Sequence, residues 1–467
     1  MDREWLLDSI INEVAEYKME QPKIVTSSKR RLTEKRDFNF PQDFVRDTDV
    51  SDGISSYRKK ALEAYLNFGI PTQDLEAWRR TDLSDLRSNS FEFAKPGAYH
   101  MLPSVPQIYL QPLVDDAHGG QIILIPGHTN IDLDPELVEK GVIFTDLITA
   151  EQKYSHLLEN ILGKFVKPED GKFASLAGAF AQNGIFLYIP KNTQIEQPLH
   201  SLIWGPGVGL AHISHVLVYI DDGASVTYVH ESASPTEAGG QTLHACNVEV
   251  YVGKAANLRF VEFQSLGQNV WNFTHESIHV DQDANLDWIF GALGSHVTKN
   301  FSDLVLSGSG STGRMSGFYF TENDQHMDHD TQQFHLAPNT TSDLLFKGAL
   351  NGRSRSVWQG MIYVAPGAFK TDGYQTNRNL ILSPHARADS IPGLEILADD
   401  VRCTHGATVG RIDEGEIFYL MSRGIPRNAA KRIITEGFFD PIMQRIPFEG
   451  VRGRLFAEIL KKMGSDL

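Results

Sequence analysis

Residues 222–229, 254–261 and 282–289 read DGASVTYV, KAANLRFV and QDANLDWI. Each stretch begins with turn and small residues and continues as a strand in which apolar and polar side chains alternate. Further strand starts fall near Thr312, Ser342 and Ala368, so the unit recurs roughly every 26 to 32 residues, a spacing typical of repeat architectures. We expect a coil of this length to hold about four strands.

Two mainly β architectures fit such a repeat: a sandwich or barrel, and a solenoid in which each coil stacks on the previous one. The strands are not joined in pairs by obvious Asn-Gly hairpin turns, and this favours the solenoid. A solenoid has open ends whose unpaired backbone groups must be covered by other elements or by a partner. Helical flanks on both sides would meet that need.

Sequence on either side of the repeats is different in character. We expect a mostly helical, mixed domain over residues 1–184, a β core over residues 185–410 and a helical domain over residues 411–467. Helices are expected at residues 4–17, 54–68, 146–162, 172–182, 413–424, 426–436 and 453–463, and short strands at residues 122–125 and 142–144. The last three helices either cover the end of the solenoid or form a docking module. Trp78 is expected in the core, beside an exposed ion pair of Glu76 and Arg79.

The composition limits the classes of function that the chain could have. The 467 residues carry a formal net charge of -16, which argues against binding to nucleic acid or to an anionic membrane. The two cysteines, Cys246 and Cys403, make no disulfide framework, and this fits a reducing compartment. No apolar run is long enough to span a bilayer, and the N-terminus matches neither a signal nor a transit peptide, so a cytoplasmic location is expected.

The segment that most resembles a metal-binding site is residues 324–335, DQHMDHDTQQFH. On a strand, His326, Asp328 and Asp330 would share one face while His329 and His335 share the other. The five donors therefore cannot converge without a turn. Donors hydrogen-bonded between neighbouring coils would give the same pattern, and we favour that structural interpretation.

Cys403 and His405, two residues apart, would project from the same face of a strand. A thiolate and an imidazole could both address one metal or one sulfur atom, but two donors complete neither a tetrahedral site nor a cluster site. The missing ligands would have to come from another chain. The alternative is a buried cysteine that packs as a small apolar residue beside a hydrogen-bonded histidine.

Several enzyme signatures are missing from the sequence. It contains no GxxxxGK[ST] phosphate loop, no GxSxG elbow and no CxxC pair, so we expect no directly bound nucleotide and no catalytic motif. An acidic solenoid could still be a polysaccharide lyase or hydrolase, with Asp372, Arg378, Arg353 and Arg355 in one groove. This carbohydrate-active enzyme is the alternative to the function that follows.

Two long segments resemble a known family. Residues 347–360, KGALNGRSRSVWQG, and residues 371–425, TDGYQTNRNLILSPHARADSIPGLEILADDVRCTHGATVGRIDEGEIFYLMSRGI, closely resemble the core of the SufB/SufD family of iron-sulfur cluster assembly proteins. Two features point to the SufD branch: Gly406 follows His405 where the SufB branch typically has a glutamate, and residues 75–83, LEAWRRTDL, look like the corresponding SufD stretch. The cysteine that SufB carries in the region equivalent to residues 378–382 is absent.

The resemblance implies a right-handed parallel β-helix between helical ends, acting as a non-enzymatic scaffold subunit. It implies that the C-terminal coils pair with a SufB-like subunit and that the C-terminal helices dock the SufC ATPase. A homodimer as the resting form stays an alternative, because the edges of a solenoid can pair with themselves. It also implies that His405, with Cys403 beside it, contributes to a site between subunits for iron or a nascent iron-sulfur cluster.

Overall fold

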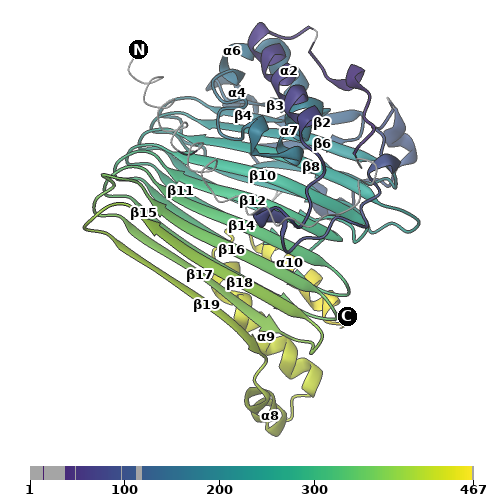
Figure 1. The fold of residues 1–467 in the computed structure, drawn as a ribbon, viewed down its shortest axis with the longest axis vertical. Helices are drawn as coiled ribbons and strands as arrows, with labels where there is room; N and C mark the ends of the chain where they lie inside the picture. The colour runs from purple at the N-terminus through teal and green to yellow at the C-terminus, as the bar shows by residue number, and fades with distance from the viewer. Residues whose placement is uncertain (1–13, 15–36, 48, 96, 112–117, 465–467) are drawn as a thin grey trace.

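The chain folds around a parallel β-solenoid, which confirms the expected fold class. The computed structural model describes residues 14, 37–47, 49–95, 97–111 and 118–464. Two stacked sheets of ten and nine strands form its body (Figure 1). The ten-stranded sheet contains, in chain order, β1 (Gly120–Ile125), β2 (His128–Leu133), β5 (Leu199–Trp204), β7 (Ser225–Ala233), β9 (Asn257–Ser265), β11 (Asn285–Ala292), β13 (Thr312–Thr321), β15 (Thr341–Leu350), β17 (Asp372–Ile381) and β19 (Arg402–Arg411). The nine-stranded sheet contains β3 (Ile143–Asp146), β4 (Asn183–Ile189), β6 (Ala211–Ile220), β8 (Thr242–Val252), β10 (Val270–Val280), β12 (Val297–Leu306), β14 (His326–His335), β16 (Arg355–Val364) and β18 (Arg387–Ile396).

Each coil supplies one long strand to each sheet, so the expectation of about four strands per coil was wrong. Strands of nine to eleven residues, such as β7 and β8, cross the whole width of the molecule in one pass. Two such strands and their turns use up the repeat length, and no residues are left for further strands. Sequence periodicity located most strand starts but underestimated how far each strand runs.

Apolar side chains fill the space between the sheets. Because the strands pair in register, equivalent inward residues stack into columns along the solenoid. One column contains Tyr228, Phe260, Trp288 and Met315, which are neighbours on β7, β9, β11 and β13 and belong to the main core cluster. The repeated sequence unit is therefore the repeated layer of this core.

The first coils are covered by the N-terminal half of the chain. Helix α7 (Lys172–Phe180) packs on β6, β8 and β10, and α2 (Asp52–Asn67) packs on α7. Trp78, in a short 3-10 helix (Glu76–Trp78), is buried against Phe173, Phe273 and Phe301, while Arg79 and Glu76 form an exposed ion pair of 3.3 Å, as expected. Smaller helices are α3 (Gln107–Leu110), α4 (Pro135–Glu139), α5 (Leu147–Lys153) and α6 (Ser155–Leu158), with 3-10 turns at Gln42–Phe44, Ser88–Ser90, Ala98–Met101 and Pro168–Asp170.

The N-terminal region also contributes strands to the two sheets. β2 pairs antiparallel with β1, and β3 pairs antiparallel with β4, so antiparallel strands close this end of the solenoid. β1 and β3 match the two expected strands, whereas β2 and β5 were not foreseen. The expected helix over residues 4–17 lies outside the described residues except for Val14, which packs near Val305, Phe334 and Tyr363. The three-domain division stays a prediction.

The C-terminal helices do not cover the other end. α9 (Arg427–Met443) and α10 (Glu449–Lys462) lie on the outer face of the ten-stranded sheet, where Phe439, Ile442 and Leu455 pack against residues such as Phe263 and Phe318. α9 continues beyond the expected residue 436 because its last turn carries the apolar side chains of this contact. α8 (Glu414–Ser422) follows the last coil and projects from the body (Figure 1). Among the described residues, no helix is both long and apolar enough to cross a membrane.

Candidate functional site at the open end of the solenoid

The last coil leaves both sheets open. β18 and β19 each have a single strand neighbour among the described residues, β16 and β17 respectively. Neither strand contains a buried residue, whereas the preceding strands are largely buried. Leu394, Ile396 and Val409 are exposed apolar side chains of this coil. A solenoid end that shows both apolar side chains and free backbone groups lacks its cover.

Cys403 and His405 lie on β19, on the same face of the strand, as the sequence predicts. Their register partners on β17 are Gly373 and Gln375. Gln375 is fully buried inside the solenoid, so the two side chains of β19 project to the inner side of the last coil. Cys403 is half-buried, while His405 is exposed because no further coil follows.

Cys403 packs inside the coil as a small apolar group. Its neighbours are Ile362, Val364 and Ala368. The glycine at position 373 makes room for the sulfur atom, since a β-carbon there would lie 3.2 Å from the Cys403 Sγ atom. Burial raises the pKa of the Cys403 thiol, so the thiolate form that binds metals is disfavoured. Of the two donors, His405 is the one that another molecule can reach.

The layer beneath His405 is polar, in contrast to the corresponding residues of the coil before it. On β17 the inward residues are Gln375, Asn377 and Asn379, where the neighbouring β15 has Leu344, Phe346 and Gly348. The Gln375 Nε2 atom donates to the Gly393 carbonyl oxygen across the interior at 2.8 Å. The Asn377 Oδ1 atom accepts from Ser390 at 2.8 Å. These side chains tie β17 to β18 and hold the last coil in place. Sequence reasoning missed them, although three amides in alternate positions of one strand are a readable signal.

The histidine-rich segment lies on β14 and is divided between two faces, as expected. Outside, the Thr81 hydroxyl contacts His326 Nε2 at 2.9 Å and donates to Asp328, which also accepts from Lys299 at 2.9 Å. Inside, His335 hydrogen-bonds to Thr340 and Ser342. Among the described residues, no group of three potential ligands could hold a metal ion. The hydrogen bonds of His326, Asp328 and His335 agree with the structural interpretation of the segment.

Burial also explains the protonation of these histidines. It lowers the pKa of His326 and His329 to about 4 and that of His335 to about 3, so all three are neutral at neutral pH. His329 packs among the rings of Phe290, Tyr319 and Phe346. Each histidine is thus held by neighbouring coils or by the N-terminal segment.

A pair of carboxyl groups is buried in the middle of the solenoid. Glu262 of β9 and Glu276 of β10 interact inside it, and burial raises the pKa of both. Asn300 and Ser302 donate to the two oxygens of Glu276 at 3.1 and 2.8 Å. Asn300 and Ser302 belong to β12, and the three strands β9, β10 and β12 all lie several coils before the open end.

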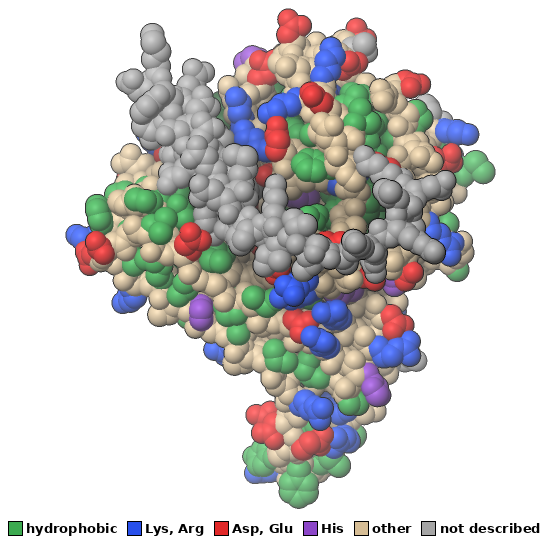
Figure 2. All heavy atoms as spheres, viewed as in Figure 1, with side chains coloured by type: hydrophobic (Ala, Val, Ile, Leu, Met, Phe, Trp, Pro, Cys, Tyr) green, Lys and Arg blue, Asp and Glu red, His purple; other side chains and the backbone are tan. Residues whose placement is uncertain are grey.

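A second exposed apolar surface lies on α8 and the adjoining part of α9. Phe418 and Tyr419 are 72% and 57% exposed, and Met421 and Ile433 are also exposed. Figure 2 shows hydrophobic side chains gathered at the tip of the molecule where α8 lies. Exposed aromatic residues on a projecting helix are typical of a protein-binding surface.

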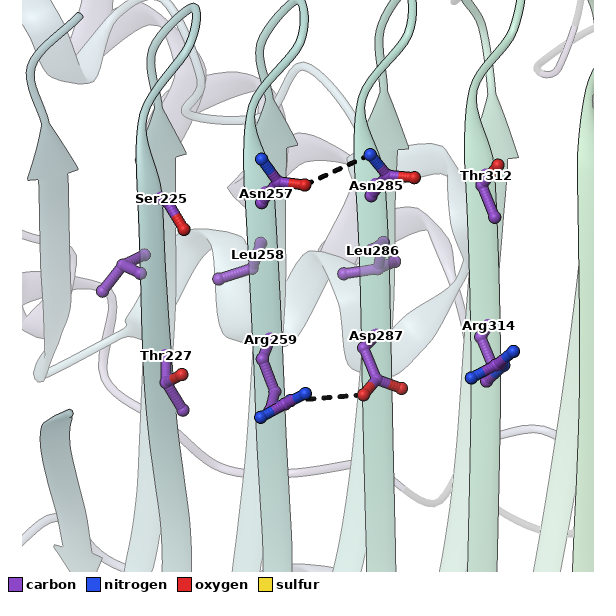
Figure 3. A pocket seen from close by; sticks show the side chains of 11 residues that line it. Ser225, Thr227, Asn257, Leu258, Arg259, Asn285, Leu286, Asp287, Thr312 and Arg314 are labelled. Atoms are coloured by element: carbon purple, nitrogen blue, oxygen red, sulfur yellow. Dashed lines mark hydrogen bonds and ion pairs between the residues drawn. The ribbon is translucent and has the colours of Figure 1, made fainter. Parts of the chain in front are cut away.

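The groove found among the described residues does not fit the carbohydrate-active alternative. A shallow groove crosses the outer face of β7, β9, β11 and β13 (Figure 3), and the only carboxylate among its lining residues is Asp287. That carboxylate forms ion pairs with Arg259 and Arg445. Glycoside hydrolysis generally needs two carboxyl groups. Asp372, Arg353 and Arg355, proposed for such a groove, instead pair separately with Arg402, Asp324 and Asp389.

Comparisons with known proteins agree with this architecture. The family described as "SUF system FeS cluster assembly, SufBD core domain" matches residues 204–438. The family described as "SufBD protein N-terminal region" matches residues 38–200. Together the two matches span the helical cover, the solenoid and part of α9.

Curated relatives carry the same description. A protein of Staphylococcus epidermidis strain ATCC 12228, named "Iron-sulfur cluster assembly SufBD family protein", is 31% identical over 321 residues, which cover 68% of each chain. A relative from Staphylococcus haemolyticus strain JCSC1435 is also 31% identical, and one from Staphylococcus aureus strain USA300 is 32% identical, each over the same share of both chains.

Proposed function

Because the chain belongs to the SufBD family of SUF-system iron-sulfur cluster assembly proteins, we propose that it is the SufD-type subunit of a cytoplasmic assembly complex. In this role it supplies half of a site for iron or a nascent cluster and contains no catalytic centre of its own. The observation that carries the proposal is the position of His405, exposed on the inner side of an unfinished coil.

The assignment to the SufD type rests on the sequence around the open end. Gly406 occupies the position where the SufB branch typically has a glutamate, and residues 378–382 contain no cysteine. A chain without that cysteine is poorly equipped to hold a cluster alone, since clusters are usually held by several thiolates. The remaining ligands then come from a SufB-like subunit.

The proposed partner binds at the open end. The free edges of β18 and β19 can continue both sheets into a second solenoid, and Leu394, Ile396 and Val409 would be buried by it. In that arrangement His405 lies between the two chains. Imidazole is a borderline ligand, so one histidine can accept ferrous iron and release it more readily than a full set of thiolates would.

We assign the docking of the SufC ATPase to α8 and the start of α9. Phe418, Tyr419 and Ile433 give this surface the aromatic and aliphatic anchors that dominate protein interfaces. The sequence has no phosphate loop, so ATP binding and hydrolysis belong to the docked subunit. Because α8 directly follows β19, movement of the docked subunit would act on the strand that carries His405.

Copurification tests this assignment. The chain, affinity-tagged and expressed at its native level, should bring down both an ABC-type ATPase and a SufB-like protein from cell extract. A matched chain with Phe418→Asp should retain the SufB-like protein and lose the ATPase. Recovery of a clean monomer that cleaves polyuronate would contradict the proposal.

A further inference from the structure

The two halves of α9 pack against different parts of the molecule. In the first half, Ala430 is buried in one cluster with Ile417 of α8. In the second half, Phe439 and Ile442 are buried in the cluster on the outer face of the ten-stranded sheet. A single helix therefore joins the projecting α8 to the solenoid (Figure 1).

The backbone of α9 is weakest where these two halves meet. Pro441 lies inside the helix. Because a proline has no N–H, the helical bond that residue 441 would donate to the Gly437 carbonyl is missing, and the ring crowds that carbonyl. Glycine is also a poor helix former, and a β-carbon at Gly437 would meet nothing within 4 Å, so packing does not require a glycine there. Helices bend at turns of this kind.

Lys347 of β15 reaches this weak turn from the solenoid. Its Nζ atom donates to the Phe438 carbonyl oxygen at 2.6 Å and lies 5.0 Å from the centroid of the Phe438 ring. Hydrogen bonds from a charged donor are stronger than those from a neutral donor, and a buried position strengthens them further. Lys347 is buried, so this bond ties the weak turn of α9 firmly to the sheet.

A lysine is an unexpected residue at this position. Its register partner on β13 is Phe318, which belongs to the apolar contact with α9, and its register partner on β17 is Arg378. Burial and the neighbouring Arg378 lower the pKa of Lys347, while Asp440 of α9 opposes this shift. An aliphatic side chain would cost less to bury here than an ammonium group. The contact that offsets this cost is the hydrogen bond to the backbone of α9.

We propose that Lys347 is a positioning residue that sets the angle at which α8 and the first half of α9 leave the solenoid. Residues 437–441 form a hinge, and the bond from Lys347 to Phe438 holds it at one angle. The inference rests on the proposed docking of the ATPase at α8, and it adds how the docked subunit is held relative to the solenoid.

Double electron–electron resonance on the full chain tests the proposal. Spin labels are attached at Ser422→Cys on α8 and Asn257→Cys on β9, both exposed positions, in a chain that also carries Cys403→Ser so that only these two sites react. Lys347→Met removes the donor and keeps an unbranched side chain, so the distribution of label distances should become about twofold wider or more. Lys347→Gln serves as a second variant if the methionine chain does not fold.

A second substitution separates a hinge from a general loss of packing. Pro441→Ala supplies the missing helical N–H, so adding it to Lys347→Met should narrow the distance distribution back toward that of the unsubstituted hinge. Lys461→Met, at an exposed lysine of the neighbouring helix α10, is the matched control for loss of charge. This control should leave the distribution unchanged.

Three results would overturn the proposal: a Lys347→Met distribution as narrow as that of the parent chain, a widening that Pro441→Ala does not reverse, or an equal widening in Lys461→Met. A parallel pull-down of the ATPase with the unlabelled wild-type chain separates this proposal from the proposed function. If the ATPase fails to bind while Lys347→Met still widens the distribution and Pro441→Ala reverses it, the docking assignment is wrong and the hinge stands.

Discussion

At the scale of single residues, exposure separates His405 from Cys403. Both project to the inner side of the last coil, but the sulfur lies in a small apolar pocket against Gly373, whereas the imidazole has no coil above it. To bind this sulfur, iron would have to displace the thiol proton, and burial opposes the loss of that proton. Cys403 therefore packs as part of the coil, and His405 is the donor that the proposed partner could reach.

Cys403→Ser should consequently leave most iron binding intact in the assembled complex. The hydroxyl keeps the size of the thiol but cannot act as a soft ligand, so any loss beyond about twofold would indicate direct ligation by sulfur. The measurement is the iron content of the anaerobically reconstituted complex. The control is Cys246→Ser, at a buried cysteine distant in sequence, which shows how much iron is lost for reasons unrelated to Cys403.

The Glu262 and Glu276 pair should make stability depend on pH. Burial raises the pKa of both carboxyl groups in the folded chain, so their protonated forms stabilise the fold below the ordinary pKa of about 4.5, and this contribution is lost as pH rises toward neutrality. Glu262→Gln should flatten that dependence and raise the free energy of unfolding at pH 8 by about 1–3 kcal/mol. Urea denaturation at pH 5 and pH 8 measures it. An unchanged difference between the two pH values would contradict the assignment.

What could be predicted at this scale followed the alternation of side chains. The shared face of Cys403 and His405 and the divided faces of residues 324–335 both come from the period of a strand, and both are confirmed. The inward amides of Gln375 and Asn377 were missed, because alternation does not say which of two faces is buried when both carry polar residues.

At the scale of elements, β19 is the strand that the account depends on. Ala407 has an outward N–H group, so Ala407→Pro should leave the ladder to β17 intact and block a strand approaching from outside. We expect the affinity for a SufB-like subunit to fall at least about tenfold, with little change in the circular dichroism spectrum. Titration by fluorescence or calorimetry measures the affinity, and Ala407→Ser is the control. Equal affinity for both variants would exclude β19 as the pairing strand.

α8 offers a second test at this scale. Phe418→Asp places a charge in the most exposed aromatic position of the helix, so ATPase binding should weaken about tenfold or more. Ile131→Asp, an exposed apolar residue of β2 at the opposite end of the solenoid, is the matched control and should bind normally. If both variants lose the ATPase equally, the effect is not specific to α8. Surface plasmon resonance with the purified ATPase distinguishes these outcomes.

The sequence predicted where helices begin and end better than it predicted where they dock. α8 lies within the expected range 413–424: the Asp413 side chain caps its start by accepting from the Gly415 N–H group, and the left-handed Gly424 follows its end. Where α9 and α10 dock could not be predicted, because an amphipathic pattern shows that one face is buried and does not identify the surface that buries it. Their position on the ten-stranded sheet leaves the solenoid end free.

At the scale of the whole molecule, the two ends of the solenoid differ. Antiparallel strands and packed helices close the first end, whereas the second end consists of two bare strands with a histidine between them. A chain that covered both ends would be a self-contained solenoid. This asymmetry supports a subunit whose site is completed by another chain. The sequence of the present chain indicates that other chain only indirectly, because its own candidate site lacks ligands.

The central claim is that His405 belongs to the site where iron or a nascent cluster is bound between subunits. The most direct test is anaerobic reconstitution of the complete complex with wild-type chain and with His405→Ala, followed by measurement of iron and acid-labile sulfide per complex. The account predicts that the variant assembles with both partners but holds markedly less iron and sulfide. Unchanged iron and sulfide contents in a fully assembled His405→Ala complex would contradict it.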